Sequence, residues 1–249
     1  ILITGGTGLI GKALGQALLK KGYQVIILTR QINKKTGTAG LSYAFWNIDK
    51  QVIDPKAIAS SDYIIHLAGA GVAEKRWTPK RKKEIRDSRI NSSRLITKSL
   101  ETIPQKVKAV VSASAIGWYG QDPSVPNPQP FTENDPAATA FLGDTCRQWE
   151  ESIEPVSKQG IRLVKLRTGI VLSKEGGALK EFLKPLRAGI AAILGNGKQI
   201  ISWIHLDDLV NMYVAAIENE GMNGSYNAVA PNPVSNKMLV LTLAKTRQQ

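Results

Sequence analysis

The sequence predicts an α/β protein built on a doubly wound parallel sheet. Short runs rich in β-branched residues alternate with stretches of helical periodicity, a pattern typical of parallel strands covered by helices. A glycine-rich turn separates the first of these runs from the first helix. The chain has 249 residues, 43% of them hydrophobic and 21% charged, which is an ordinary composition for a globular protein with a large core.

Six short apolar runs are expected to form the strands. In chain order they are Ile1–Thr4, Tyr23–Thr29, Tyr43–Trp46, Tyr63–Ala68, Val107–Ser112 and Ile161–Thr168. Helices are expected over Leu9–Lys21, Lys75–Arg94, Phe141–Ser157, Leu206–Asn219 and from Asn236 onward. The segment Asp122–Pro136 contains five prolines and is predicted to be a loop, with the length of a lid or binding loop.

Charge and composition argue against several classes of protein. The chain carries 33 lysines and arginines against 20 acidic residues, and this net charge of +13 favours anionic partners. Nine basic residues lie in Lys75–Arg94, but the apolar stripe and scarce aromatic residues of this stretch favour a solvated helix face over a nucleic-acid surface. Without a long apolar run, and with two histidines and one cysteine, neither a membrane span nor a metal site is expected. The lone Cys146 and the lack of a signal peptide predict a cytoplasmic protein.

The strongest motif is T-G-G-T-G-L-I-G over Thr4–Gly11, directly between the first strand and the first helix. Gly5 permits a tight turn, Gly8 lets the backbone approach a pyrophosphate, and Gly11 lets the helix pack closely against the strand. The pyrophosphate would lie at the positive N-terminus of the helix. A glycine-rich turn without a ligand is the alternative. The cofactor-binding residues predicted here are Gly5, Thr7, Gly8, Leu9, Ile10 and Gly11.

The residue after the second strand indicates which dinucleotide binds. Enzymes specific for NAD place an acidic residue there for the ribose 2′-hydroxyl, whereas this chain has Arg30. An arginine attracts a 2′-phosphate and can stack on adenine, so NADP is the predicted cofactor, with Lys34 and Lys35 as possible helpers. The alternative is a surface arginine without a role in binding.

Three further segments resemble the extended, epimerase-like branch of the short-chain dehydrogenase/reductases. They are His66-Leu67-Ala68-Gly69, Ser112-Ala113-Ser114 with Trp118-Tyr119-Gly120, and Arg167-Thr168-Gly169. The resemblance runs over nearly the whole chain, and finer features are similar to a subfamily of nucleotide-sugar epimerase homologues. It implies that the cofactor also contacts Leu67, Ala68, Gly69, Ser112 and Thr168, and that Ser114 carries the catalytic-site hydroxyl.

One departure from this family concerns its acid/base, a tyrosine with a lysine four residues later. The lysine lowers the pKa of the phenol, which then exchanges a proton with the substrate while hydride moves. None of the six tyrosines here has a lysine at that spacing, and the expected positions are Leu142 and Cys146. Tyr119 and Glu133 are the remaining candidates for proton transfer, although packing is the favoured role of Tyr119 and a structural role that of Glu133. His205 is expected to have a capping or inter-lobe role rather than a catalytic one.

After Arg167 the alternation of strands and helices weakens. We therefore expect a Rossmann-like NADP-binding domain over residues 1–168 and a smaller, irregular substrate-side lobe over residues 169–249. The fold is expected to be incomplete at its C-terminus. The predicted function is an NADP-binding epimerase, dehydratase or reductase that acts on a nucleotide-sugar or related carbonyl compound by an atypical mechanism. The alternative is a non-catalytic NADP-binding sensor or scaffold.

Overall fold

An eight-stranded sheet forms the centre of the computed structural model, which describes residues 1–31, 37–73, 75–125 and 127–247. Its strands lie in the order β12-β7-β6-β5-β1-β2-β3-β4, and every neighbouring pair is parallel except β3 and β4. The bounds are β1 (Leu2–Thr4), β2 (Val25–Thr29), β3 (Leu41–Asn47), β4 (Val52–Ile53), β5 (Tyr63–His66), β6 (Ala109–Ala115), β7 (Arg162–Thr168) and β12 (Gly224–Ala228). The predicted α/β class and doubly wound sheet are confirmed.

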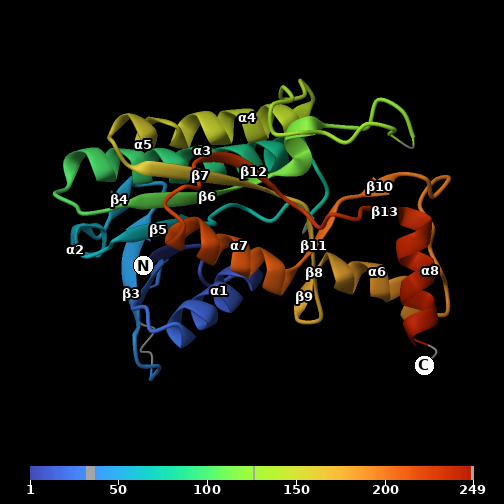
Figure 1. Cartoon of the computed structure of the whole chain (residues 1–249), viewed down its shortest axis with the longest axis horizontal. Helices are drawn as coiled ribbons and strands as arrows, with labels where there is room; N and C mark the ends of the chain where they lie inside the picture. The colour runs from blue at the N-terminus through green and yellow to red at the C-terminus, as the bar shows by residue number, and fades with distance from the viewer. Residues whose placement is uncertain (32–36, 74, 126, 248–249) are drawn as a thin grey trace.

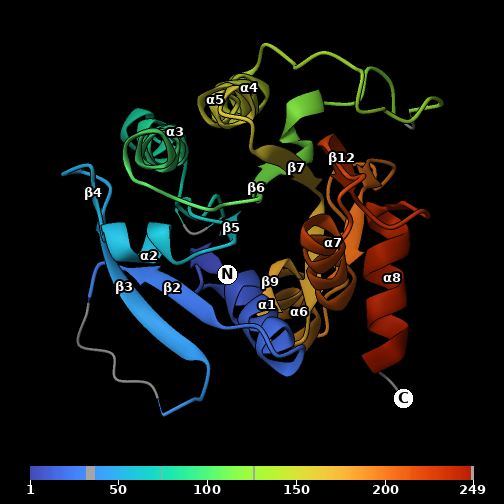
Figure 2. The same ribbon diagram turned by 60° about the vertical axis from the view of Figure 1, so that its left-hand side comes forward.

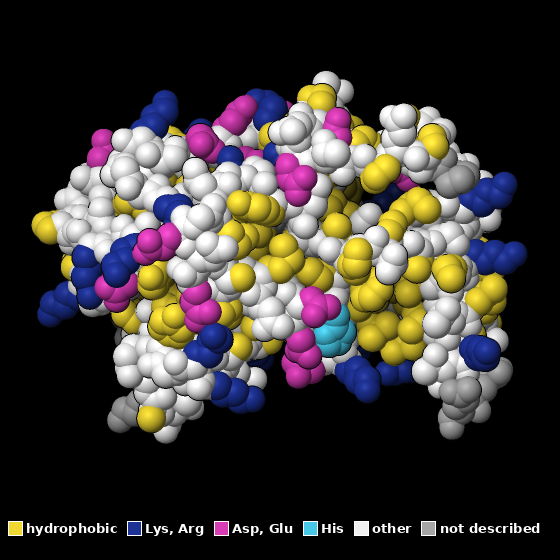
Figure 3. All heavy atoms as spheres, in the orientation of Figure 1, with side chains coloured by type: hydrophobic (Ala, Val, Ile, Leu, Met, Phe, Trp, Pro, Cys, Tyr) yellow, Lys and Arg dark blue, Asp and Glu magenta, His cyan; other side chains and the backbone are white. Residues whose placement is uncertain are grey.

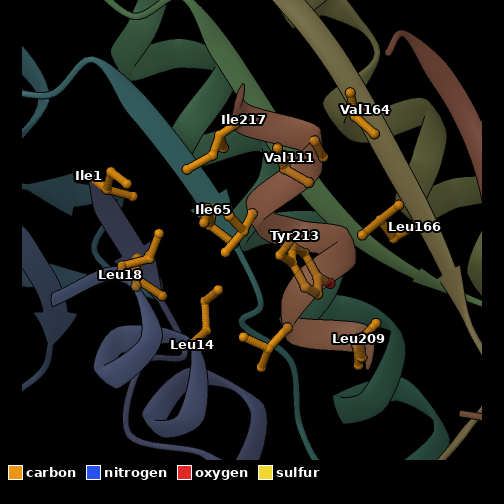
Figure 4. Packing of buried hydrophobic residues seen from close by; sticks show 14 of the residues in the cluster. Ile1, Leu14, Leu18, Ile65, Val111, Val164, Leu166, Leu209, Tyr213 and Ile217 are labelled. Carbon is orange, nitrogen blue, oxygen red and sulfur yellow. The ribbon is translucent and has the colours of Figure 1, made fainter. Parts of the chain in front are cut away.

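Helices cover both faces of this sheet (Figures 1 and 2). One face carries α1 (Leu9–Lys20) and α7 (Leu206–Glu218), and the other carries α2 (Pro55–Ala59), α3 (Pro79–Thr102), α4 (Phe141–Ile153) and α5 (Pro155–Lys158). The core on the first face includes the fully buried Tyr213 of α7, and Leu14, Leu18 and Leu166 belong to the same cluster of buried side chains (Figure 4). Burial of such large apolar side chains on both faces is the main driving force for this fold.

Two helix boundaries have a local physical cause. The basic helix α3 begins at Pro79 rather than Lys75, because the Thr78 hydroxyl accepts a hydrogen bond from the Arg81 amide at 3.2 Å and proline is favoured in the first turn. At the start of α7, Nδ1 of His205 accepts from the Asp207 amide at 3.2 Å. His205 therefore caps a helix, as the sequence indicated.

The C-terminal part of the chain contributes to two regions. Helix α7 and strand β12 return to the main sheet, where β12 pairs with β7. The rest, as far as residue 247, forms two small sheets and two helices, and hydrophobic side chains gather on the exposed face near these helices (Figure 3). These elements are β8 (Ile170–Ser173), β9 (Gly176–Gly177), α6 (Ala178–Arg187), β10 (Ile200–Ile201), β11 (Trp203–His205), β13 (Val234–Ser235) and α8 (Asn236–Arg247). The boundary at residue 168 stays a prediction, and the second range includes two elements of the main sheet layer.

A buried polar network joins the ends of β1 and β5. The Thr4 hydroxyl oxygen accepts from the amides of Leu67 and Ala68 at 3.0 and 3.1 Å and lies 2.8 Å from Nδ1 of His66. Because the oxygen already accepts two N–H groups, we assign its own hydrogen to a bond donated to Nδ1. The other ring nitrogen of His66 then carries a hydrogen and faces the hydroxyls of Ser92 and Ser93 on α3, at 3.3 and 3.2 Å. Burial lowers the pKa of His66 to about 4, so this histidine is neutral at pH 7.

His66 should make the stability of the protein depend on pH. Its pKa rises from about 4 in the folded chain to about 6.5 in the unfolded chain, so between these values the unfolded state binds more protons. We expect the free energy of unfolding to fall by about 1 kcal/mol for each pH unit in this window as pH decreases. Urea unfolding of the native chain and of His66→Gln at pH 7, 6 and 5 measures the difference. Parallel pH dependence of the two proteins would contradict this assignment.

The first turn of α1 should not tolerate an added methyl group at Gly11. A Cβ there would lie 2.5 Å from the carbonyl oxygen of Gly5, whereas a Cβ at Gly15, one turn later in the same helix, would meet nothing within 4 Å. We expect Gly11→Ala to destabilise the protein by about 1–3 kcal/mol and Gly15→Ala to stabilise it by about 0.5–1 kcal/mol. Equal effects of the two substitutions on the urea midpoint would refute the close packing at Gly11.

Candidate functional site

A cleft of about 1140 Å³ lies at the carboxyl ends of β1, β2, β3 and β5 and is closed on one side by α3. This is the edge at which open parallel sheets bind ligands. Seven of the predicted cofactor-binding residues line it. They are Gly5, Thr7, Gly8, Arg30, Leu67, Ala68 and Gly69. The structure therefore brings together the glycine-rich turn, the arginine after β2 and the segment after β5.

The other predicted cofactor-binding residues lie around this cleft without lining it. Leu9 and Ile10 pack against the core, and Gly11 is buried beneath the turn. On the neighbouring strands, the Ser112 hydroxyl donates to the carbonyl of Ala113 at 3.1 Å and the Thr168 hydroxyl to that of Leu166 at 3.2 Å. Their part in cofactor binding stays a prediction.

The glycine-rich turn has the geometry of an anion site. Gly5 adopts a φ of +66°, and a Cβ there would lie 2.9 Å from the backbone of Leu67. Gly8 is the N-cap of α1, and along this helix, which the structure describes in full, no side chain caps the N-terminus and no acidic residue lies in the first turn. The first amides of α1 and the positive end of its dipole are thus free to meet a phosphate. The turn fits the pyrophosphate of a dinucleotide.

Charges of both signs line the β2 side of the cleft, where Arg30 follows β2 and Asp49 follows β3. Arg30 is exposed at the rim, beside residues that follow β3, whereas Lys34 and Lys35 lie outside the described residues. On the α3 side the acidic groups are paired. Glu84 binds Arg81 at 2.7 Å, which holds the pKa of Glu84 below its usual value, and Asp87 pairs with Lys83 and with Arg86 at 3.1 Å. These pairs reduce the repulsion that an anionic ligand would meet.

The positions at which the family carries its tyrosine and lysine are apolar. Leu142 and Cys146 lie on α4 against Gly117, where an added Cβ would be 3.3 Å from Leu142 Cβ and 3.5 Å from the Cys146 sulfur. Cys146 is 4% exposed, and its burial raises the pKa of the thiol to about 11. At neutral pH neither side chain exchanges protons, so the environment matches the departure seen in the sequence.

The three predicted catalytic residues meet instead at the ion pair between Arg167 of β7 and Glu150 of α4. Arg167 forms a buried ion pair with Glu150 of α4, at 2.9 and 3.1 Å. The Ser114 hydroxyl donates to the same carboxylate at 2.6 Å, and Arg167 donates to the Tyr119 hydroxyl at 3.1 Å and to the carbonyl of Glu133 at 3.0 Å. Each group therefore has a hydrogen-bond partner within the protein, as buried polar groups require.

The same network anchors the proline-rich segment to the sheet. The Tyr119 hydroxyl donates to the side-chain oxygen of Asn227 on β12 at 2.6 Å, and the Glu133 carboxylate accepts from the Asn227 amide at 2.7 Å. The Tyr119 ring stacks on Phe131 with centroids 5.0 Å apart. Arg167 also lies 3.7 Å from the ring centroid of Trp118. These contacts give Tyr119 and Glu133 structural roles, and their catalytic roles stay predictions.

The sequence did not reveal the pairing of Glu150 with Arg167. A buried carboxylate on a helix and an arginine on the next strand are joined only by the tertiary fold, and neither residue carries a local motif. The sequence indicates Arg167 only as the residue before Thr168, and nothing in it points to a pairing with Glu150. The described residues contain no cluster of acidic, histidine or cysteine side chains that could hold a metal ion. In the same residues, no helix combines the length and apolar character needed to cross a bilayer.

Comparisons with known proteins show the family to which the chain belongs. The sequence matches the model of the NAD dependent epimerase/dehydratase family over residues 1–228. It is 34% identical over 236 residues to an epimerase family protein of Mycobacterium bovis, covering 95% of this chain and 75% of that protein. Epimerase family protein YfhF of Bacillus subtilis is 34% identical over 250 residues, with 100% of this chain and 80% of that protein covered.

Two solved structures are similar in fold and sequence. The human epimerase family protein SDR39U1, solved with NADPH, has a TM-score of 0.83 and 28% identity, covering 100% of this chain and 80% of that one. A nucleoside-diphosphate sugar epimerase of Corynebacterium glutamicum has a TM-score of 0.81 and 35% identity. The match covers 98% of this chain and 49% of the Corynebacterium chain, so this chain spans about half the length of that protein. The present chain belongs to the NAD-dependent epimerase/dehydratase family.

Proposed function

We propose that this protein binds NADP(H) in the cleft and acts slowly, as an epimerase, dehydratase or reductase, on a nucleotide-sugar or related carbonyl compound. The observation that carries the cofactor proposal is the position of Arg30 at the rim of the cleft that the glycine-rich turn shapes. A guanidinium there matches a 2′-phosphate in charge and hydrogen-bond geometry. The NADPH in the related human structure supports the same choice.

The residues of the chain have distinct parts in this proposal. Gly5 and Gly8 leave room for the pyrophosphate and present the amides of α1, and Arg30 holds the 2′-phosphate. Leu67 and Ala68 form the floor on which the dinucleotide lies, held by the Thr4 hydroxyl. When bound, the nicotinamide supplies or accepts a hydride. Positioning of the reactants contributes several kcal/mol even without acid/base help.

Proton transfer is the step for which the usual residues are missing. The missing tyrosine and lysine normally contribute acid/base catalysis of about 10²–10⁴-fold. Ser114 would have to turn its hydroxyl away from Glu150 to meet a substrate, and Tyr119 would have to leave Asn227. Such rearrangements cost hydrogen bonds, so the proposal is a slow reaction rather than a fast epimerase.

The proposed class of substrate rests on similarity to related proteins. The Corynebacterium relative is named a nucleoside-diphosphate sugar epimerase, and this chain's net charge of +13 suits an anionic substrate. We keep the prediction that the basic helix α3 does not serve nucleic acid, since several of its charges are paired on the helix itself, as Lys83 is with Asp87.

A second candidate is a non-catalytic NADP-binding protein that senses redox state or holds a partner. Its support is the apolar environment of Leu142 and Cys146, together with the hydrogen bonds that occupy Ser114 and Tyr119. Both candidates need the same cofactor cleft and differ only in turnover.

Cofactor preference tests the cleft. We expect NADPH to bind at least about tenfold more tightly than NADH, because a charge-assisted hydrogen bond is worth about 1.5–3 kcal/mol. Arg30→Ala should abolish most of this preference, whereas Lys158→Ala, which removes a remote exposed charge, should keep it. Calorimetric titration of both cofactors against the three proteins decides the matter. Equal affinities in the native chain would remove Arg30 from the site.

Turnover separates the two candidates. We expect a screen of nucleotide-sugars and small carbonyl compounds with saturating NADPH to give rates below about 1 s⁻¹, under the usual enzyme range. Ser114→Ala should lower any such rate further. A faster reaction would contradict the slow mechanism, and its loss in Tyr119→Phe would make Tyr119 the proton donor. Binding of NADPH without any turnover would favour the sensor or scaffold.

A further inference from the structure

Arg89 of α3 is a cation next to the end of the cleft that lies away from Arg30. One of its terminal nitrogens, Nη1, donates to the carbonyls of Ala70 and Ile85 at 3.0 and 2.9 Å. Its guanidinium lies 5.0 Å from the centroid of the Trp149 ring on α4. The side chain therefore bridges α3, α4 and the segment that follows β5.

The guanidinium lies against the wall of the cleft. A Cβ at Gly69 would be 3.1 Å from the Arg89 Cζ, so a glycine at this position leaves the space that the guanidinium occupies. Gly69 and Ala70 both line the cleft, and Ala70 is held from α3 twice, since its amide also donates to the Ser88 hydroxyl at 3.0 Å. Arg89 is thus fixed beside the cleft and not on a free surface.

Part of the hydrogen-bonding capacity of Arg89 is unused. Among the described residues, no acceptor lies within hydrogen-bond distance of its Nε or Nη2 atoms, and these atoms are not sealed from solvent. Cys146 lies close enough on α4 for its thiol and the guanidinium to influence each other. An arginine remains charged in proteins even when burial lowers its pKa. Three N–H donors with a permanent charge therefore remain available.

The order of the strands indicates what these donors would meet. A dinucleotide with its 2′-phosphate at Arg30 after β2 and its pyrophosphate above the turn after β1 must continue towards β5 and β6, because the sheet runs β2-β1-β5-β6. The second ribose then lies over the segment after β5, beside Arg89. Ribose hydroxyls accept hydrogen bonds, and a guanidinium presents several donors in a fixed geometry.

We propose that Arg89 binds the nicotinamide-side ribose of NADP(H) and supplies a cation near Cys146 of α4. This inference rests on the proposed cofactor site and goes beyond it. In this proposal α3 provides the positive charge that the apolar positions Leu142 and Cys146 of α4 do not.

The test compares whole and partial cofactors. NADPH and adenosine 2′,5′-bisphosphate, which lacks the nicotinamide ribose, are titrated by calorimetry against the native chain, Arg89→Met and Arg89→Lys. We expect Arg89→Met to weaken NADPH about 10- to 100-fold, the effect of a charge-assisted hydrogen bond, and to leave the bisphosphate unchanged. Arg89→Lys should recover part of the loss. Arg94→Met, on the same helix and exposed, is the matched control.

The outcomes separate this proposal from the cofactor site itself. Binding of neither ligand to the native chain would overturn the site. Native-like binding of NADPH to Arg89→Met, or an equal loss for both ligands, would overturn the role of Arg89 alone. If Arg89→Met does not fold, Arg89→Gln replaces it, because an amide can still donate to Ala70 while the charge is lost. The fluorescence of bound NADPH gives a second readout, which should change in the Arg89 variants and not in Arg94→Met.

Discussion

The Thr4 hydroxyl holds the floor of the cofactor cleft in place, and much of the candidate site depends on it. At the end of β1 it accepts hydrogen bonds from the amides of Leu67 and Ala68, which follow β5, and it meets His66 beneath them. Buried hydrogen bonds of this kind are costly to leave unmade, so they fix the distance between the two strand ends. The glycine-rich turn starts at the next residue, and Ser92 and Ser93 extend the network to α3.

The two halves of the site differ in chemistry. The half near β1 and β2 is polar, with the glycine-rich turn on one side and Arg30 at its rim. The half near α4 is apolar at Leu142 and Cys146, and its polar groups, Ser114 and Tyr119, hydrogen-bond to the Arg167–Glu150 ion pair. A buried ion pair is weak evidence for added stability, but losing one partner is expensive. These residues hold the proline-rich segment and β12 together. This structural role accounts for their burial without a role in proton transfer.

Local signals predicted the main sheet and the glycine-rich turn because both depend on periodicity and on glycine spacing. The helix start at Pro79 was missed by a few residues, although its signal, the capping Thr78 followed by Pro79, is local, because the run of basic residues from Lys75 was included in the predicted helix. Strand β12 escaped prediction because Gly224–Ala228 has little apolar character and gains its place by pairing with β7. Within the candidate site, Arg30 and the glycine-rich turn could be predicted from the sequence. The pairing of Glu150 with Arg167 could not, because neither residue belongs to a local motif.

The phosphorus resonance of the 2′-phosphate in bound NADP tests the cofactor site most directly. A free phosphate monoester loses its second proton near pH 6, and a neighbouring guanidinium favours the doubly charged form. If Arg30 meets this group, ³¹P NMR of the complex should show the 2′-phosphate fully ionised at pH values where the free cofactor is half protonated. A bound 2′-phosphate that titrates like the free one would contradict the account.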